Sequence, residues 1–271
     1  MRFVCLQTLT CASRGAEGGR PLVVLGSVEV EEDGGRVKRD LAHFCGVAGE
    51  DGAQLFLMAI DGSDVRRLTL SGGESGQVTD DYAHWSPDGG SIVFQRTTRP
   101  EGGSPDADIW LIDVETGEER QVTDTPEDWD STPSFAADGK SVLFESNREG
   151  GFSVQRLNLE TMEVVALTSG EGTDAEAKES PDGRLVAFAS TRDGGFNVYV
   201  MDADGGNVRR LTDSEADDRC PQWSPDGKML SFYSERDGDR EIYVMNADGS
   251  EQRRLTDSPG NDEVADWVAA P

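Results

Sequence analysis

Histidine is almost absent from this sequence, and lysine is scarce. The 271 residues include two histidines, His43 and His84, and four lysines. The two histidines lie in different segments and share no motif with a nucleophile. A histidine-based catalytic or metal site is therefore not expected. We also find no Gly-x-Ser-x-Gly motif of serine hydrolases and no glycine-rich phosphate loop before a helix. The sequence thus predicts a protein that is not an enzyme.

The four cysteines do not form a metal-binding pattern. Cys5, Cys11, Cys45 and Cys220 have spacings that match no zinc site. Free buried thiols are the expected state, and a disulfide between Cys45 and Cys220 is the alternative.

Long apolar runs are missing as well. The weakly apolar N-terminal stretch, residues 1–12, is interrupted by Gln7, Thr8 and Thr10. It is a poor match to a signal peptide and is too short to span a membrane. Residues 1–20 are expected to be a flexible N-terminal arm, and no membrane insertion is expected.

Positive charge is also in short supply. With 53 acidic and 25 basic residues, the net charge is −28. Nucleic acids and anionic membrane surfaces are disfavoured as partners, whereas basic partners or cations are favoured. A high-salt habitat is an alternative reason for the acidic excess.

A repeat of 44 to 50 residues organises the chain. Asp-Gly turns at Gly89, Gly139, Gly183 and Gly227 are spaced by 50, 44 and 44 residues. Each unit contains short alternating segments separated by turns, and none shows a helical stripe of apolar residues. This pattern predicts an all-β propeller of four-stranded antiparallel blades. Phenylalanines recur on the second strands and are expected to pack between blades: Phe94, Phe144, Phe188 and Phe232.

The two ends of the repeat array complement each other. Residues 262–267 resemble a first strand with no second strand after it, and residues 41–69 resemble strands two to four with no first strand. We therefore expect a single propeller domain over residues 21–271, with recognisable repeats over 41–270. The C-terminal strand is expected to dock on the N-terminal blade and close a ring of five blades. Six blades are the alternative, if residues 21–37 form additional strands.

One aspartate recurs five residues before the first-strand aromatic position of every unit. The five residues are Asp80, Asp130, Asp174, Asp218 and Asp262. In one interpretation each aspartate caps its own loop by accepting backbone N–H bonds. In the other, the aspartates face a channel mouth and hold a cation, for which carboxylates suit Ca²⁺. No cofactor is required by the sequence, and Ca²⁺ is the one that such a site would take.

Arginines recur at two further positions. Arg148, Arg192 and Arg236 precede acidic-Gly pairs, and we expect them to be salt-bridged or solvated turn residues. Arginine pairs recur on the outer strands, where we interpret them as charges that protect the edge of the sheet from aggregation. They are Arg66-Arg67, Arg209-Arg210 and Arg253-Arg254.

The segments Trp223–Gly238 and Ile242–Thr256 resemble the repeat of the TolB-type (WD40-like) β-propeller family, as do Trp85–Gly89 and Asn197–Gly205. The resemblance covers about residues 41–270. It implies a non-enzymatic propeller that binds a protein or peptide partner, and a periplasmic or other extracytoplasmic location. From the charge we expect that partner to be basic, and we expect the protein to be a monomer. The alternatives are a Ca²⁺-stabilised or halophilic structural propeller and, third, a propeller-based lyase or hydrolase.

Overall fold

The protein is built from β-strands throughout the part of the chain that the structure describes. A computed structural model describes residues 2–6, 22–32, 35–47, 53–59, 63–69, 77–126, 128–169, 172–257 and 259–268. Within these ranges there is no helix, and consequently none that is long and apolar enough to cross a membrane. The chain divides into two compact units, residues 9–134 and residues 1–8 with 135–271. A single domain over residues 21–271 stays a prediction.

The first unit contains two four-stranded antiparallel sheets, each ordered as it runs in sequence. The strands of the first sheet are β2 (Leu22–Glu32), β3 (Gly35–Val47), β4 (Ala53–Ala59) and β5 (Arg66–Arg67). The strands of the second sheet are β6 (Val78–Trp85), β7 (Ser91–Thr98), β8 (Asp106–Asp113) and β9 (Glu119–Gln121). β10 (Asp130–Phe135) follows, and the second unit begins at its last residue.

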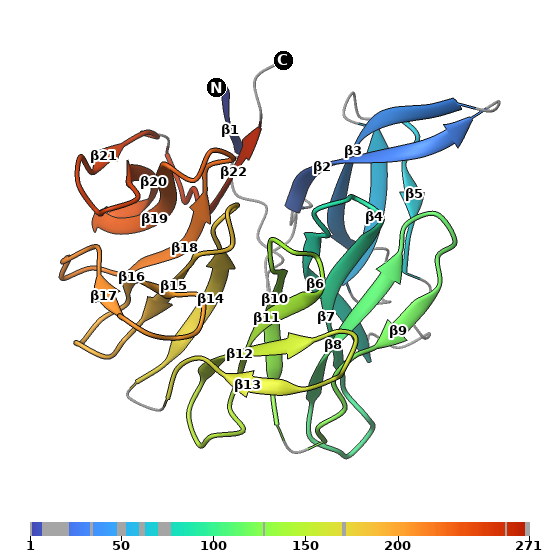
Figure 1. Cartoon of the computed structure of the whole chain (residues 1–271), viewed down its shortest axis with the longest axis horizontal. Coiled ribbons are helices and arrows are strands. Elements are labelled where there is room, and N and C mark those ends of the chain that lie inside the picture. Colours follow the sequence, from blue (N-terminus) through green and yellow to red (C-terminus); the bar gives the residue numbers. More distant parts are fainter. Residues whose placement is uncertain are drawn as a thin grey trace. The chain divides into compact units, whose positions relative to one another are not determined.

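The third, fourth and fifth sheets repeat this order (Figure 1). The third sheet continues from β10 with β11 (Ser141–Ser146), β12 (Ser153–Asn158) and β13 (Val164–Ala166). The fourth has β14 (Asp174–Glu179), β15 (Leu185–Ser190), β16 (Asn197–Asp202) and β17 (Arg209–Arg210). The fifth has β18 (Asp218–Trp223), β19 (Met229–Asp237), β20 (Asp239–Asn246) and β21 (Arg253–Arg254). The protein therefore has the predicted all-β architecture of four-stranded antiparallel propeller blades.

The two ends of the array differ from the expectation. The first sheet has a first strand of its own, β2, which pairs with β3 from Leu22↔Cys45 to Glu32↔Gly35. The sequence favours this pairing, because two valine-containing stretches flank the sequence Asp-Gly-Gly, which is typical of a hairpin. β2, in the segment expected to supply an extra blade or none, thus completes this sheet.

The C-terminal strand has a different partner from the one predicted. β22 (Val264–Val268) pairs with β1 (Arg2–Leu6) in a two-stranded sheet, in the register Phe3↔Trp267. Because β2 occupies the place left for a first strand, β22 does not pair with the first sheet among the described residues. Residues 2–6, which fall within the expected flexible arm, form a strand. Closure of the ring stays a prediction.

The phenylalanine ladder forms the core between consecutive sheets, as predicted. Phe188 is buried against Leu143 and Val154 of the third sheet, and Phe232 against Val198 and Val200 of the fourth. In the first unit, Phe94 packs in the same way against leucines of β4. Burial of apolar side chains between neighbouring sheets therefore stabilises each unit.

A threonine after each outer strand binds the third strand of its own sheet. Thr212 Oγ1 accepts a hydrogen bond from Val198 N–H at 3.0 Å. The same bond recurs in all five four-stranded sheets, with Thr69, Thr123, Thr168 and Thr256 as the other acceptors. The recurring threonine is thus explained by a buried backbone N–H that needs a partner.

Candidate functional site

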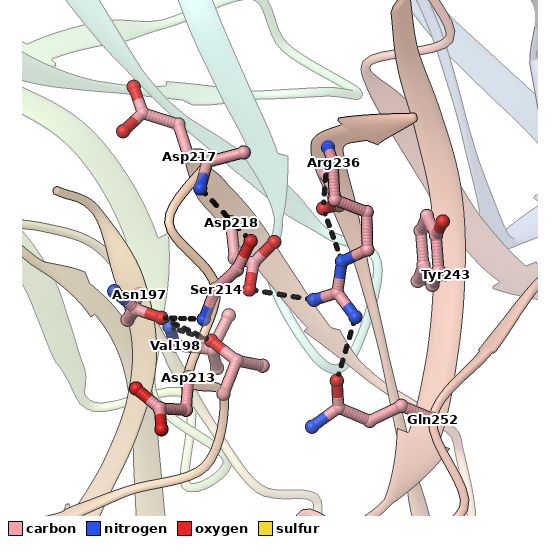
Figure 2. A network of polar contacts seen from close by, with 12 residues as sticks. Asn197, Val198, Asp213, Ser214, Asp217, Asp218, Arg236, Tyr243 and Gln252 are labelled. Atoms are coloured by element: carbon pink, nitrogen blue, oxygen red, sulfur yellow. Dashed lines mark hydrogen bonds and ion pairs between the residues drawn. The ribbon is translucent and has the colours of Figure 1, made fainter. Parts of the chain in front are cut away.

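The recurring aspartate of the fifth sheet binds an arginine of the next strand. Asp218, the first residue of β18, is fully buried, and its Oδ2 accepts a bond from Arg236 Nη2 at 2.8 Å. Arg236 Nε also donates to Ser234 Oγ at 2.8 Å, and Nη1 donates to Gln252 Oε1 (Figure 2). The guanidinium lies 4.6 Å from the ring centroid of Tyr243. We call this arrangement an aspartate–arginine centre.

The fourth sheet has the same centre. Arg192 Nη2 donates to both oxygens of Asp174 at 3.0 Å, and Arg192 Nε donates to Ser190 Oγ. Its guanidinium lies 5.2 Å from the ring centroids of Phe188 and Tyr199. Salt-bridging of Arg192 and Arg236 in the turn is as expected. Their partner, a buried aspartate at the start of the first strand, was not foreseen.

The second sheet builds its centre from a different position. Arg96 binds both oxygens of Asp80, at 2.6 and 3.0 Å, and its guanidinium lies over the rings of Phe94 and Trp110. Arg96 follows Phe94 by two residues, whereas Arg192 follows Phe188 by four. The charge therefore reaches the same place from two backbone positions on the second strand.

The other two aspartates of the series are buried as well. Asp130 is fully buried and accepts a hydrogen bond from Thr125 Oγ1 at 3.2 Å. Asp262 is also buried, and its N–H donates to Arg240 O at 2.7 Å. Main-chain bonds of the same kind join Asp174 to Phe152 O and Asp218 to Phe196 O. The aspartate position is thus a junction between successive sheets.

The described residues do not contain a cluster of three or more His, Cys, Asp or Glu side chains placed to hold a metal ion. A cation held by Asp80, Asp130, Asp174, Asp218 and Asp262 stays a prediction. In three of these carboxylates the negative charge is already balanced by an arginine guanidinium, so a bound cation is not required to balance it.

In four sheets a residue with left-handed backbone follows the recurring aspartate by two positions, and sequence reasoning missed it. Tyr82, Thr132, Glu176 and Cys220 have φ between 46° and 58°. The register of the first strand shifts at this point in the second, fourth and fifth sheets. A left-handed backbone is unfavourable for residues with a Cβ. Because the four side chains differ in type, no residue pattern marks the bulge.

The bulges of the fourth and fifth sheets contact each other. Glu176 accepts hydrogen bonds from Arg219 Nη2 at 2.6 Å and from Cys220 N–H at 2.8 Å. Burial, with the nearby Glu176 carboxylate, raises the pKa of the Cys220 thiol well above its usual value. Cys220 is a free thiol, as expected, but it is half-buried. The other cysteines lie where side chains are not described.

The first-strand aromatic position also joins successive sheets. Trp223 Nε1 donates to Lys178 O, and Trp267 Nε1 donates to Gln222 O. Glu179 stands at this position in the fourth sheet, where the other units have tryptophan or phenylalanine. It also joins two successive sheets, through its carboxylate. It accepts bonds from Ala137 N–H at 2.7 Å and from Arg156 Nη2 at 2.5 Å, both in the third sheet. The exception therefore provides the counter-charge for Arg156.

One carboxyl group is buried among acids in the second sheet. Asp108 accepts bonds from Gln121 Nε2 at 3.0 Å and from Thr123 Oγ1 at 3.3 Å. Burial, and then the neighbouring Asp106 and Asp130, raise the pKa of Asp108 to about 6.

Of the two histidines, His84 has a described side chain. Its Nδ1 lies 2.9 Å from the backbone oxygen of the next residue, Trp85.

Known proteins with this architecture were found by sequence family and by structure. Residues 153–270 match the family model of the TolB beta propeller domain. No curated protein matches. The structure of TolB from Acinetobacter baumannii is 23% identical with a TM-score of 0.67, and the match covers 82% of this chain and 52% of that one. The chain thus spans about half the length of that protein.

Two further structures extend the comparison. A putative TolB from Agrobacterium tumefaciens is 24% identical with a TM-score of 0.65, over 90% of this chain and 83% of that one. An oligogalacturonate lyase in complex with manganese is 19% identical with a TM-score of 0.59, over 89% and 74%. At these identities the structures share the fold. Residues 153–270 are thus similar to the TolB beta propeller domain, as the repeats predict.

Proposed function

We propose that this protein is a non-enzymatic binding module for a basic protein or peptide partner. The observation that carries the proposal is that many of its few positively charged side chains are bound within the chain itself. The net charge is −28, and many arginines are bound within the chain. The following bind a carboxylate or a backbone carbonyl of their own chain: Arg66, Arg67, Arg96, Arg156, Arg192, Arg210, Arg219, Arg236, Arg240 and Arg254. The field that a partner meets is therefore strongly negative.

The internal use of polar groups also supports binding over catalysis. The repeated aspartates and arginines neutralise each other inside the sheets, which leaves them poorly placed to act on a substrate. The propeller fold itself does not decide the question, because a lyase shares it. An activity screen with polyuronides and peptides tests the enzyme alternative, and turnover of either would contradict the proposal.

The binding test uses the full-length protein and a display library of random peptides. We expect selection to enrich peptides rich in lysine and arginine, with saturable binding that weakens as salt is raised. Scrambled peptides of equal charge report on sequence specificity. Failure to obtain any saturable binder, or enrichment of acidic peptides, would overturn the proposal.

We also propose that the sheets close into one propeller ring of five blades. Within each unit, phenylalanines pack between neighbouring sheets, Phe94 in the first unit and Phe188 and Phe232 in the second, and this supports the proposal. The six-bladed alternative depended on additional strands from residues 21–37, and β2 of that segment belongs to the first four-stranded sheet. A compact monomer of this length has a radius of gyration of about 18 Å. Small-angle X-ray scattering should give that value, and a clearly larger one would contradict closure.

A further inference from the structure

The outer strand of the third sheet differs from the other four. Each outer strand is followed by a hydrophobic residue and then the recurring threonine. Of the two residues just before this pair, at least one is arginine in four of the sheets. In β13 they are Val165 and Ala166. Val165 is 50% exposed, and Ala166 is exposed as well. β13 is the last strand in its sheet, so its outer side is an edge.

The arginines of the other outer strands bind at the strand end. Arg67 Nε donates to Thr69 O at 2.7 Å, and the equivalent bonds join Arg210 to Thr212 O and Arg254 to Thr256 O. Charged side chains of this kind hinder the addition of a further strand. Ala166 occupies the equivalent position in β13 and has no side chain that reaches Thr168 O.

The backbone of β13 presents bonding groups to the outside. Asn158 N–H donates to Glu163 O, and Leu167 N–H donates to Val154 O, so residues 163, 165 and 167 face β12. In an antiparallel pair, alternate residues direct their N–H and C=O groups to opposite sides. Val164 and Ala166 therefore direct theirs away from the sheet.

We propose that β13 accepts a further strand from an extended, basic segment of a partner protein. On the face of the sheet that carries Val165 and the exposed Glu163, the segment places a small apolar side chain opposite Val165 and, two residues along, a lysine or arginine opposite Glu163. This inference rests on the proposed binding function and names its surface. A second copy of this chain is a poor occupant, because two chains of charge −28 repel each other.

The probe is a labelled peptide that repeats the sequence lysine–serine–valine–serine, so that lysine and valine follow each other on one face of the extended chain. It is titrated by fluorescence anisotropy against the full chain. We expect saturable binding. The double variant V165R/A166R introduces the arginine pair that three of the other outer strands carry, and it should weaken binding at least about tenfold. The same peptide with glutamate in place of each lysine, and the probe with N-methylated backbone amides, should bind at least about tenfold more weakly than the probe.

A matched variant makes the reverse change. Arg209 is the counterpart of Val165 in β17, and R209V should increase the binding of the probe. Circular dichroism and melting curves establish that each variant is folded, and the N-methylated peptide needs only the wild-type protein. The inference is overturned if the N-methylated peptide binds as well as the probe. It is also overturned if V165R/A166R leaves the affinity unchanged.

Two outcomes separate this inference from the proposed function. If library-selected peptides bind V165R/A166R as tightly as wild type, the binding function stands and the β13 surface is wrong. If no library peptide binds at all, the binding function itself fails. A concentration-dependent dimer that V165R/A166R dissolves, seen by analytical ultracentrifugation, would overturn the basic partner in favour of a second copy.

Discussion

Replacing Asp108 by asparagine should stabilise the protein at neutral pH. The Asp108 carboxyl is only 8% exposed, and its neighbours are acids. Asn197 holds the equivalent position in the fourth sheet, where its Oδ1 accepts bonds from Thr212 Oγ1 at 3.2 Å and Ser214 N–H at 3.1 Å. Asparagine therefore fits the site and makes the local bonds without a buried charge.

The magnitude follows from the pKa of Asp108. Burial raises this pKa from 3.8 to about 6, a change of about two units. Each unit is worth about 1.4 kcal/mol, so ionisation of Asp108 costs the folded state on the order of 3 kcal/mol at neutral pH. Between these two pKa values the folded state binds more protons than the unfolded state. This cost is therefore absent below about pH 4, grows as the pH rises to about 6, and is constant above that.

The measurement is the free energy of unfolding of wild type and D108N in urea, as a function of pH. At about pH 8 we expect D108N to be more stable by about 1 to 3 kcal/mol, which raises its melting temperature by roughly 3 to 10 °C. At about pH 3 the two proteins should coincide. E118Q removes an exposed charge from the same sheet and serves as the control. A gain of equal size at both pH values, or no gain at about pH 8, would refute the reasoning.

Three other predictions concern the repeated interactions. R236M leaves the buried Asp218 without its guanidinium and should lower the free energy of unfolding by about 3 to 5 kcal/mol. The double variant D218N/R236M should recover part of this loss. A loss below about 1 kcal/mol for R236M would contradict the aspartate–arginine centre. T212V removes the acceptor of Val198 N–H and should cost about 1 to 3 kcal/mol, whereas T212S should be nearly neutral in the same urea titration. If the five aspartates bind Ca²⁺, the melting temperature rises saturably with Ca²⁺ and D80N and D218N reduce the rise; identical melting curves would remove the cation hypothesis. A rise with NaCl alone would favour the halophilic alternative.

The repeat made much of the fold predictable from the sequence. Turn residues and strand formers recur at a fixed period, so the strand order of each sheet and the burial of Phe188 and Phe232 follow from local pattern alone. The pairing of β22 was beyond this reasoning. Strand partners at the chain ends depend on which competing edge is free, and β2 carries none of the marks of the repeat.

The aspartate position was predictable, but its partner was not. Asp218 and Arg236 are 18 residues apart, and their contact depends on the register of β18 and β19, which sequence spacing does not give. In the second sheet even the position of the arginine changes, from four residues after the phenylalanine to two. The constraint acts on the place of the charge in space, so an alignment by residue position conceals it.

The left-handed position of the first strand gives four of the repeats one site at which the backbone conformation is constant and the side chain can change. Tyr82, Thr132, Glu176 and Cys220 stand on nearly the same backbone conformation, and they represent an aromatic, a hydroxyl, an acid and a thiol. A protein built in this way is a natural display scaffold. Successive repeats can diversify the chemistry that they present by single substitutions. In the second, fourth and fifth sheets, the ion pair of the aspartate two residues earlier binds this strand to the next one.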